Sequence, residues 1–355
     1  MIPLSVIGLG INTFLLVFVG LAVGILSGFV GVGGGYLMTP ALIILGLPAN
    51  FAVGTSLAWL VGNSVIGTLR HRQLGNIDMK LGLLLAAGMM CGVEVGVRLL
   101  NLTKNIGVTD VAVLSTSTVI LVVVGTHTFK EVRKRKAQLD EMLKRRGELP
   151  SAMRLPSIAR RLQGLNVPPT IHFAKSRLAV SLWVILAIGF LTGTLAGFVG
   201  VGGGFVMLPS LIYLIGLPSF MAVGTDIFQI IFSASFGCIR HTMSGNVIIF
   251  LAFLLMLGSS IGTQFGALIT QYVRGISMRY VLVISILLCV LGSILKLLDL
   301  LLAVPAPWLQ AGAVAVTFGG MGFVVAMIIA LYIMAIRYSH GRPVPAWMES
   351  LVAKD

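Results

Sequence analysis

The sequence predicts an all-α, polytopic membrane protein built from two inverted repeats, each with a glycine-broken, re-entrant half-helix. Three observations carry this prediction: the composition, the succession of apolar segments and an internal repeat. The chain of 355 residues is 57% hydrophobic and 10% charged, whereas soluble proteins carry about 25% charged residues. Its mean hydropathy of +1.03 indicates that lipid surrounds most of the chain.

Apolar segments follow one another along most of the chain, many of them near the roughly 20 residues that a helix needs to cross a bilayer. Only helices and closed barrels satisfy their backbone within lipid. Runs such as 81–87 and 281–291 lack the alternation of barrel strands, which favours helices. The expected segments are 3–30, 35–47, 51–69, 77–100, 106–129, 178–199, 205–217, 219–239, 247–270, 278–302 and 308–336.

An internal repeat divides the chain into two halves. The run GFVGVGGG at Gly28–Gly35 returns residue for residue at Gly197–Gly204. Shorter matches follow in the same order: GLP at 46 and 216, AVGT at 52 and 222, RH at 70 and 240, and GN at 75 and 245. Such a collinear series indicates a duplication. The expected domains are a first repeat over 1–129, a basic loop over 130–177, a second repeat over 178–302, and a terminal helix with its tail over 303–355.

The net charge of +14 is concentrated in one loop. Residues 130–177 contain 13 Lys and Arg against 4 Asp and Glu. Because membrane helices flank this stretch, we expect a cytoplasmic loop that attracts anionic lipid headgroups, and no nucleic-acid partner. Each repeat has an odd number of segments, so the second should enter the membrane with the opposite orientation. The loop charges then place the N-terminus outside and the C-terminus in the cytoplasm.

The glycine run of each half is predicted to be a break at which a half-helix begins. The segments that follow, 35–47 and 205–217, are too short to span a bilayer at about 1.5 Å per residue. A helix start directs unpaired N–H groups and a positive dipole end at whatever lies in front of it. Two such ends near the midplane would hold an anion, although the glycines could instead serve only close helix packing. The candidate ligands are Gly31, Gly33, Gly34, Gly35, Gly200, Gly202, Gly203 and Gly204.

Polar side chains after each break are further candidates for the anion site: Thr55, Ser56, Asn63, Thr225 and Gln229. The threonines either cap a helix or contact the ligand. Asn63 and Gln229 either form interhelical hydrogen bonds or line a path. Asp226 stands where the first half has Ser56, and an acid in the membrane interior needs a partner, a proton or a cation. It either pairs with an arginine at the membrane edge or takes part in proton coupling.

Charged pairs mark the ends of two equivalent helices. Arg70 with His71, and Arg240 with His241, either anchor these ends at the membrane boundary or attract anions to the mouths of the path. Glu94 and Arg98 are four residues apart and are expected to pair on one helix face. No metal cluster, Ser–His–acid set or cofactor-ligating set can be assembled from the sequence. We therefore expect no cofactor, no metal and no enzymatic activity.

The motifs quoted above resemble those of the sulfite exporter TauE/SafE family. They are GFVGVGGG followed by an aromatic residue, an aliphatic residue and Met in each half, with AVGT, RH and GN downstream. The resemblance covers about 1–129 and 178–302. It implies a secondary transporter of sulfite, sulfonates or other organosulfur anions in the bacterial inner membrane. The 130–177 loop and the last segment exceed the usual family length, and Asp226 departs from the small hydroxyl residue that is usual there.

The leading hypothesis is thus an ion- or proton-coupled transporter of a small sulfur-containing or carboxylate anion. A passive anion channel would use the same site without coupling. A non-transporting scaffold or sensor, whose basic loop binds a partner, is a third hypothesis. The sequence leaves open the substrate, the direction of transport, the coupling ion and the oligomeric state, for which a homodimer is one option.

Overall fold

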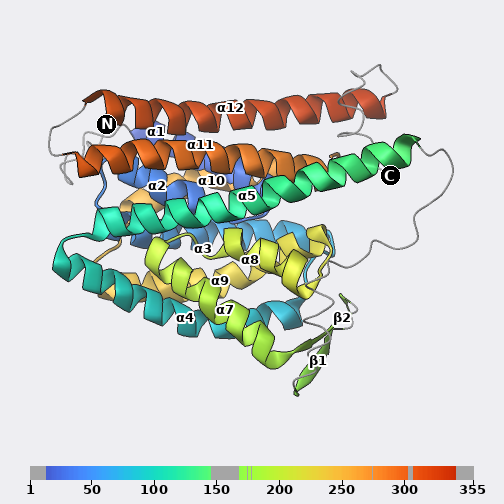
Figure 1. The fold of residues 1–355 in the computed structure, drawn as a ribbon, viewed down its shortest axis with the longest axis horizontal. Coiled ribbons are helices and arrows are strands. Elements are labelled where there is room, and N and C mark those ends of the chain that lie inside the picture. The colour runs from blue at the N-terminus through green and yellow to red at the C-terminus, as the bar shows by residue number, and fades with distance from the viewer. Residues whose placement is uncertain are drawn as a thin grey trace.

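The protein consists almost entirely of helices that run side by side (Figure 1). The computed structural model describes residues 13–144 and 168–340, apart from 174, 177, 274 and 303–306. The first half contains α1 (Thr13–Val30), α2 (Gly35–Ile44), α3 (Ala49–Gln73), α4 (Met79–Ile106) and α5 (Thr109–Lys144). The second half contains α7 (Leu182–Val199), α8 (Gly204–Ser210), the π-helical turn η2 (Leu211–Ile215), α9 (Ser219–Met243), α10 (Ile249–Ile269) and α11 (Gly275–Leu301), and α12 (Pro307–Ser339) follows.

The polytopic all-helical fold is confirmed. Among the described residues, nine helices are long and apolar enough to cross a membrane, and two shorter apolar helices span Gly35–Ile44 and Gly204–Ile215. Two features lie outside the expected membrane segments. The helix α5 continues to Lys144, into the predicted basic loop. A small antiparallel hairpin joins β1 (Thr170–Phe173) to β2 (Leu178–Ser181), with Thr170 opposite Ser181.

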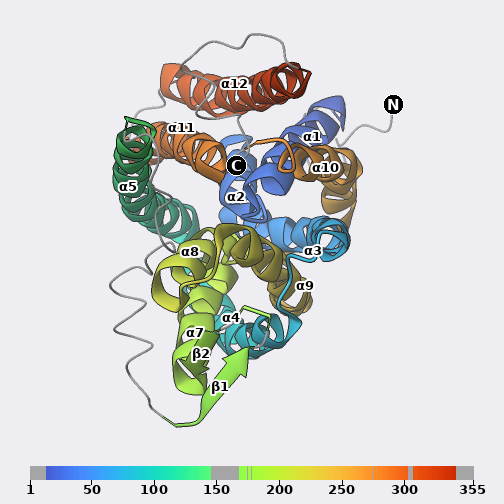
Figure 2. The same ribbon diagram turned by 90° about the vertical axis from the view of Figure 1, so that its right-hand side faces the viewer.

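The two halves are interleaved, because α1 packs along α10 and α4 packs along α7 (Figure 2). Glycines recur at every fourth position on the facing sides, so that the backbones touch. A Cβ atom on Gly28 would lie 2.2 Å from the carbonyl oxygen of Thr263, and one on Gly92 would lie 2.1 Å from that of Phe190. The glycines at these contacts are Gly20, Gly24, Gly28, Gly258, Gly262 and Gly266 in the first pair, and Gly88, Gly92, Gly96, Gly189, Gly193 and Gly197 in the second.

The equivalent helices α3 and α9 cross at the centre and run in opposite directions. A Cβ atom on Gly67 would lie 3.0 Å from Ile227, near the start of α9, and one on Gly237 would lie 3.0 Å from Leu57, near the start of α3. Two equivalent helices related in this way support the inverted repeat that the sequence predicts. The orientation of the chain across a membrane stays a prediction.

The segments expected in the cytoplasm lie at one end of the molecule. The turn between α3 and α4, the end of α5, the β-hairpin and the end of α12 all lie at the right-hand end of Figure 1. The hairpin contacts the start of α4, because Lys80 Nζ donates to the carbonyl oxygen of His172 (3.4 Å). This shared end agrees with the grouping of basic loops in the sequence.

The second half-helix accommodates one additional residue. Pro40 precedes Gly46 by six residues, whereas Pro209 precedes Gly216 by seven. The π-helical turn η2 holds the extra residue, since such a turn contains one more residue than an α-helical turn. Both half-helices therefore end in the same way, with Gly46 and Gly216 at φ values of 94° and 91°.

Candidate functional site

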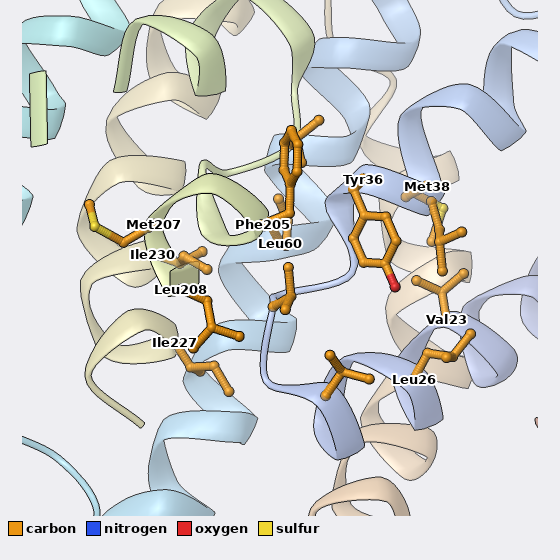
Figure 3. Packing of buried hydrophobic residues seen from close by; sticks show 14 of the residues in the cluster. Val23, Leu26, Tyr36, Met38, Leu60, Phe205, Met207, Leu208, Ile227 and Ile230 are labelled. Carbon is orange, nitrogen blue, oxygen red and sulfur yellow. The ribbon is translucent and has the colours of Figure 1, made fainter. Parts of the chain in front are cut away.

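The two glycine breaks lie against each other at the centre of the molecule. A Cβ atom on Gly35 would be 2.6 Å from the carbonyl oxygen of Val201, and one on Gly204 would be 2.5 Å from that of Val32. The next residue of each half-helix is aromatic, and the two rings meet, with 6.3 Å between the centroids of Tyr36 and Phe205 (Figure 3). The helices α2 and α8 therefore begin close together, at equivalent positions of the two repeats.

Backbone geometry explains why the breaks need glycine. Three residues in each break have positive φ, a region that is unfavourable for residues with a Cβ atom. The angles are 78°, 75° and 78° at Gly31, Gly33 and Gly34, and 77°, 69° and 77° at Gly200, Gly202 and Gly203. Gly35 and Gly204 do not need this freedom, but the close approach of the other break leaves no room for a side chain.

Each break presents backbone donors. The first hydrogen bonds of α2 run from the N–H groups of Leu37 and Met38 to the carbonyl oxygen of Gly34, at 3.1 and 3.2 Å. In α8 the N–H groups of Val206 and Met207 likewise donate to Gly203, at 3.0 and 2.8 Å. The N–H groups that precede these lie in the first turn, where a helix provides no acceptor. Two sets of donors and two positive dipole ends thus come together.

Two equivalent aliphatic side chains close the space at the breaks. Leu60 of α3 and Ile230 of α9 are both completely buried. A Cβ atom on Gly33 would lie 2.9 Å from Ile230 Cδ1, and one on Gly202 would lie 2.8 Å from Leu60 Cδ1. Figure 3 shows Leu60 between the two half-helices. Leu60 and Ile230 therefore pack directly against the two breaks, each against the break of the opposite repeat.

Asn63 links the first break to two helices. Its Nδ2 atom donates to Ser27 Oγ on α1 (2.8 Å) and to the carbonyl oxygen of Gly33 (3.3 Å). The hydroxyl group of Thr263, on α10, donates to Asn63 Oδ1. The interhelical hydrogen bonds expected for Asn63 are therefore present. Gln229 differs, because its amide bonds within its own helix, to Asp226.

Asp226 lies at the second break and is completely buried. Its Oδ1 atom accepts a hydrogen bond from Gln229 Nε2 (2.9 Å). Its Oδ2 atom faces the start of α8, 3.0 Å from where a Cβ atom on Gly204 would lie, and has no hydrogen-bond partner among the described residues. The suggested pairing with an arginine is wrong within the described chain. Ser56, at the equivalent position, also has a buried hydroxyl group without a described partner.

The two threonines join the halves. Thr55 Oγ1 accepts from the N–H group of Ile248 (3.1 Å), and Thr225 Oγ1 accepts from that of Asp78 (3.0 Å). Ile248 and Asp78 immediately precede α10 and α4, so each threonine binds at a helix start in the opposite repeat. The glycine before each threonine contacts the GN turn of the opposite repeat: Gly54 lies against Asn246, and Gly224 lies against Asn76. The AVGT and GN motifs are therefore two sides of one contact.

The two Arg-His pairs differ in their surroundings. Arg240 Nε and Arg98 Nε lie 2.5 and 2.8 Å from the carboxylate of Glu94, which confirms the expected Glu94–Arg98 pair. Arg70 instead donates to Gln73 Oε1 (3.2 Å). Both His71 and His241 are buried, and a ring nitrogen of His241 lies 3.0 Å from the carbonyl oxygen of Gly197. Among the described residues no three His, Cys, Asp or Glu side chains form a metal-binding group.

Comparison with known proteins identifies the family. The sequence model of the family described as Sulfite exporter TauE/SafE matches residues 16–295 and, in a second match, 185–342. The chain is 27% identical over 287 residues to the probable membrane transporter protein YunE of Bacillus subtilis, covering 78% of this chain and 95% of that protein. It is 24% identical over 273 residues to YjnA of the same organism, another probable membrane transporter protein, covering 73% and 93%. No solved structure matches the chain at a significant level. The match of the family over most of the chain shows that this protein belongs to the sulfite exporter TauE/SafE family of membrane proteins.

Proposed function

We propose that the protein is a secondary transporter that holds a small anion between its two glycine breaks. The observation that carries this proposal is the meeting of two helix starts, at Gly35 and Gly204, within a buried centre. Helix starts attract anions through N–H donors and dipole ends, and water is largely absent there to compete. The family and the names of its relatives support transport as the activity.

The donors favour a compact anion with exposed oxygen atoms. Backbone N–H groups recognise negative oxygens, and the glycines let those oxygens approach the backbone. Sulfite, sulfonates and small carboxylates all present such oxygens. Ser56 and Asn63, on α3, are additional polar groups for the anion. The family description supports the sulfur-containing members of this class.

Asp226 is the proposed site of proton coupling. An ionised carboxylate beside Gly204 would occupy the positive end of α8 and repel an anion from it. A buried carboxylate without a cation is also costly, which favours the neutral acid in this structure. When Asp226 releases its proton, the charge that appears would weaken anion binding. Binding of an anion and of a proton would thus favour each other.

Flux into reconstituted vesicles tests the function and separates a transporter from a channel. Radiolabelled sulfite, thiosulfate, a sulfonate and a small carboxylate would each be supplied with and without an imposed pH gradient. A proton-coupled transporter accumulates its anion above the outside concentration when the gradient is present. In the absence of a membrane potential, a passive channel can only bring the anion to the same concentration on both sides of the membrane. Absence of flux for all four anions would contradict the proposal.

A further inference from the structure

A second polar site lies at the hairpin end of the molecule, away from the glycine breaks. There a cavity of about 350 Å³ opens beneath the β-hairpin, where α3 turns into α4. This volume falls in the range of small-molecule sites. The cavity is lined by Arg72, Ile77, Asp78, Met79, Lys80, Phe173 and Lys175.

The lining combines three cations with one carboxylate that is already engaged. Asp78 Oδ1 accepts from the N–H group of Leu81 (3.2 Å), and Asp78 Oδ2 accepts from the hydroxyl group of Ser176 (2.9 Å). Lys80 Nζ lies 5.8 Å from the centre of the Phe173 ring. Within the described chain no carboxylate forms an ion pair with Arg72, Lys80 or Lys175. The cavity therefore has an excess of positive charge.

The cavity is linked to the second break by a short chain of contacts. The backbone N–H group of Asp78, a lining residue, donates to Thr225 Oγ1 (3.0 Å). Thr225 immediately precedes Asp226, whose carboxylate faces the start of α8. A ligand in the cavity would thus lie next to the helix that carries the proposed coupling residue.

The opposite end of the molecule lacks these charges. The positions of the second repeat that correspond to Arg72, Asp78 and Lys80 are Thr242, Ile248 and Phe250. Arg240 at that end is paired with Glu94. The hairpin that supplies Lys175 also has no counterpart in the other repeat among the described residues. The cations that line this cavity are therefore not repeated at the equivalent positions of the second repeat.

We propose that this cavity is an oxyanion-binding vestibule, in which Arg72, Lys80 and Lys175 hold the anion before it enters the path from the hairpin end. The inference rests on the proposed function and extends it to a second site. Sulfite and sulfonates have the charge and the oxygen acceptors that ammonium and guanidinium groups bind. A lipid phosphate shares this chemistry, but a vestibule on the path should take the free solute.

Sulfite flux measured from each face tests the vestibule. In vesicles of zwitterionic lipid, the double substitution Lys80→Gln with Lys175→Gln should raise the half-saturating sulfite concentration at the hairpin face by at least about fivefold, because two charged contacts are lost. The maximal flux and the half-saturation at the other face should not change. Lys80→Arg with Lys175→Arg keeps both charges and should restore binding. Arg98→Gln, which removes an exposed cation elsewhere, is the matched control.

Three results would overturn the vestibule: an unchanged half-saturation, an equal rise at both faces, or a rise that appears only when anionic lipid is added. The last would identify a headgroup site.

Thermal unfolding of the purified protein with sulfate gives a readout that needs no transport. Sulfate should stabilise the double glutamine variant less than the wild type, because the variant keeps only the proposed site at the glycine breaks. If no anion is transported but this difference remains, the proposed function fails while the site stands; equal stabilisation of both proteins would refute the site.

Discussion

At the scale of single residues, Asp226 is where the two breaks differ in charge. The glycines at positive φ are the same in both halves, whereas Asp226 takes the place of Ser56. Both side chains are completely buried, and each has a polar atom without a described partner. The repeat therefore provides two similar helix starts, of which only one has an acid in front of it. This asymmetry is the basis of the proposed proton coupling at Asp226.

Replacing Asp226 with Asn should remove the effect of pH on transport. The amide retains the shape and a hydrogen bond to Gln229 but cannot release a proton. Downhill sulfite flux should continue, while accumulation driven by a pH gradient should disappear. Asp299→Asn, which changes an acid paired with Lys296 elsewhere, is the control. A pH profile equal to that of the wild type would exclude Asp226 from the coupling.

At the scale of elements, glycines at every fourth position mark the helix faces that pack closely together. The sequence predicts most helix starts and both breaks closely, because apolar runs and glycine clusters are local signals, but the end of α5 lies well beyond the expected segment. It does not predict that α1 pairs with α10 and α4 with α7. A glycine at every fourth position marks a face for close packing, but the partner of that face depends on the whole fold. The contact between the AVGT and GN motifs was missed for the same reason.

Gly92→Val should destabilise the protein through the α4–α7 contact. The added Cβ atom would lie 2.1 Å from the carbonyl oxygen of Phe190, so the helices must separate. Overpacking of this kind costs about 1–3 kcal/mol or more, which lowers the midpoint of thermal unfolding by roughly 2 °C or more. Gly319→Val is the control, because no atom lies within 4 Å of a Cβ atom at Gly319. Equal unfolding midpoints for the two variants would argue against this contact.

At the scale of the whole molecule, the chain combines a nearly symmetric centre with two different ends. The hairpin at one end was not predicted, because strands of four residues in a polar loop leave little periodicity to detect. The location of the breaks was predicted from the repeat, since equivalent segments of a duplicated chain tend to adopt equivalent positions. Their closure by Leu60 and Ile230 was not, because neither residue carries a distinguishing motif.

The most direct measurement is anion flux through vesicles that contain variants of the glycine breaks. Gly34→Val and Gly203→Val each place a branched side chain at positive φ and against neighbouring atoms at 2.9 and 2.6 Å. Both should insert into the membrane, yet flux of sulfite, or of the tested anion that the wild type carries fastest, should fall by at least about tenfold, equivalent to 1.4 kcal/mol. Gly319→Val should transport normally. Wild-type flux in properly inserted Gly34→Val and Gly203→Val proteins would contradict an anion site at the two helix starts.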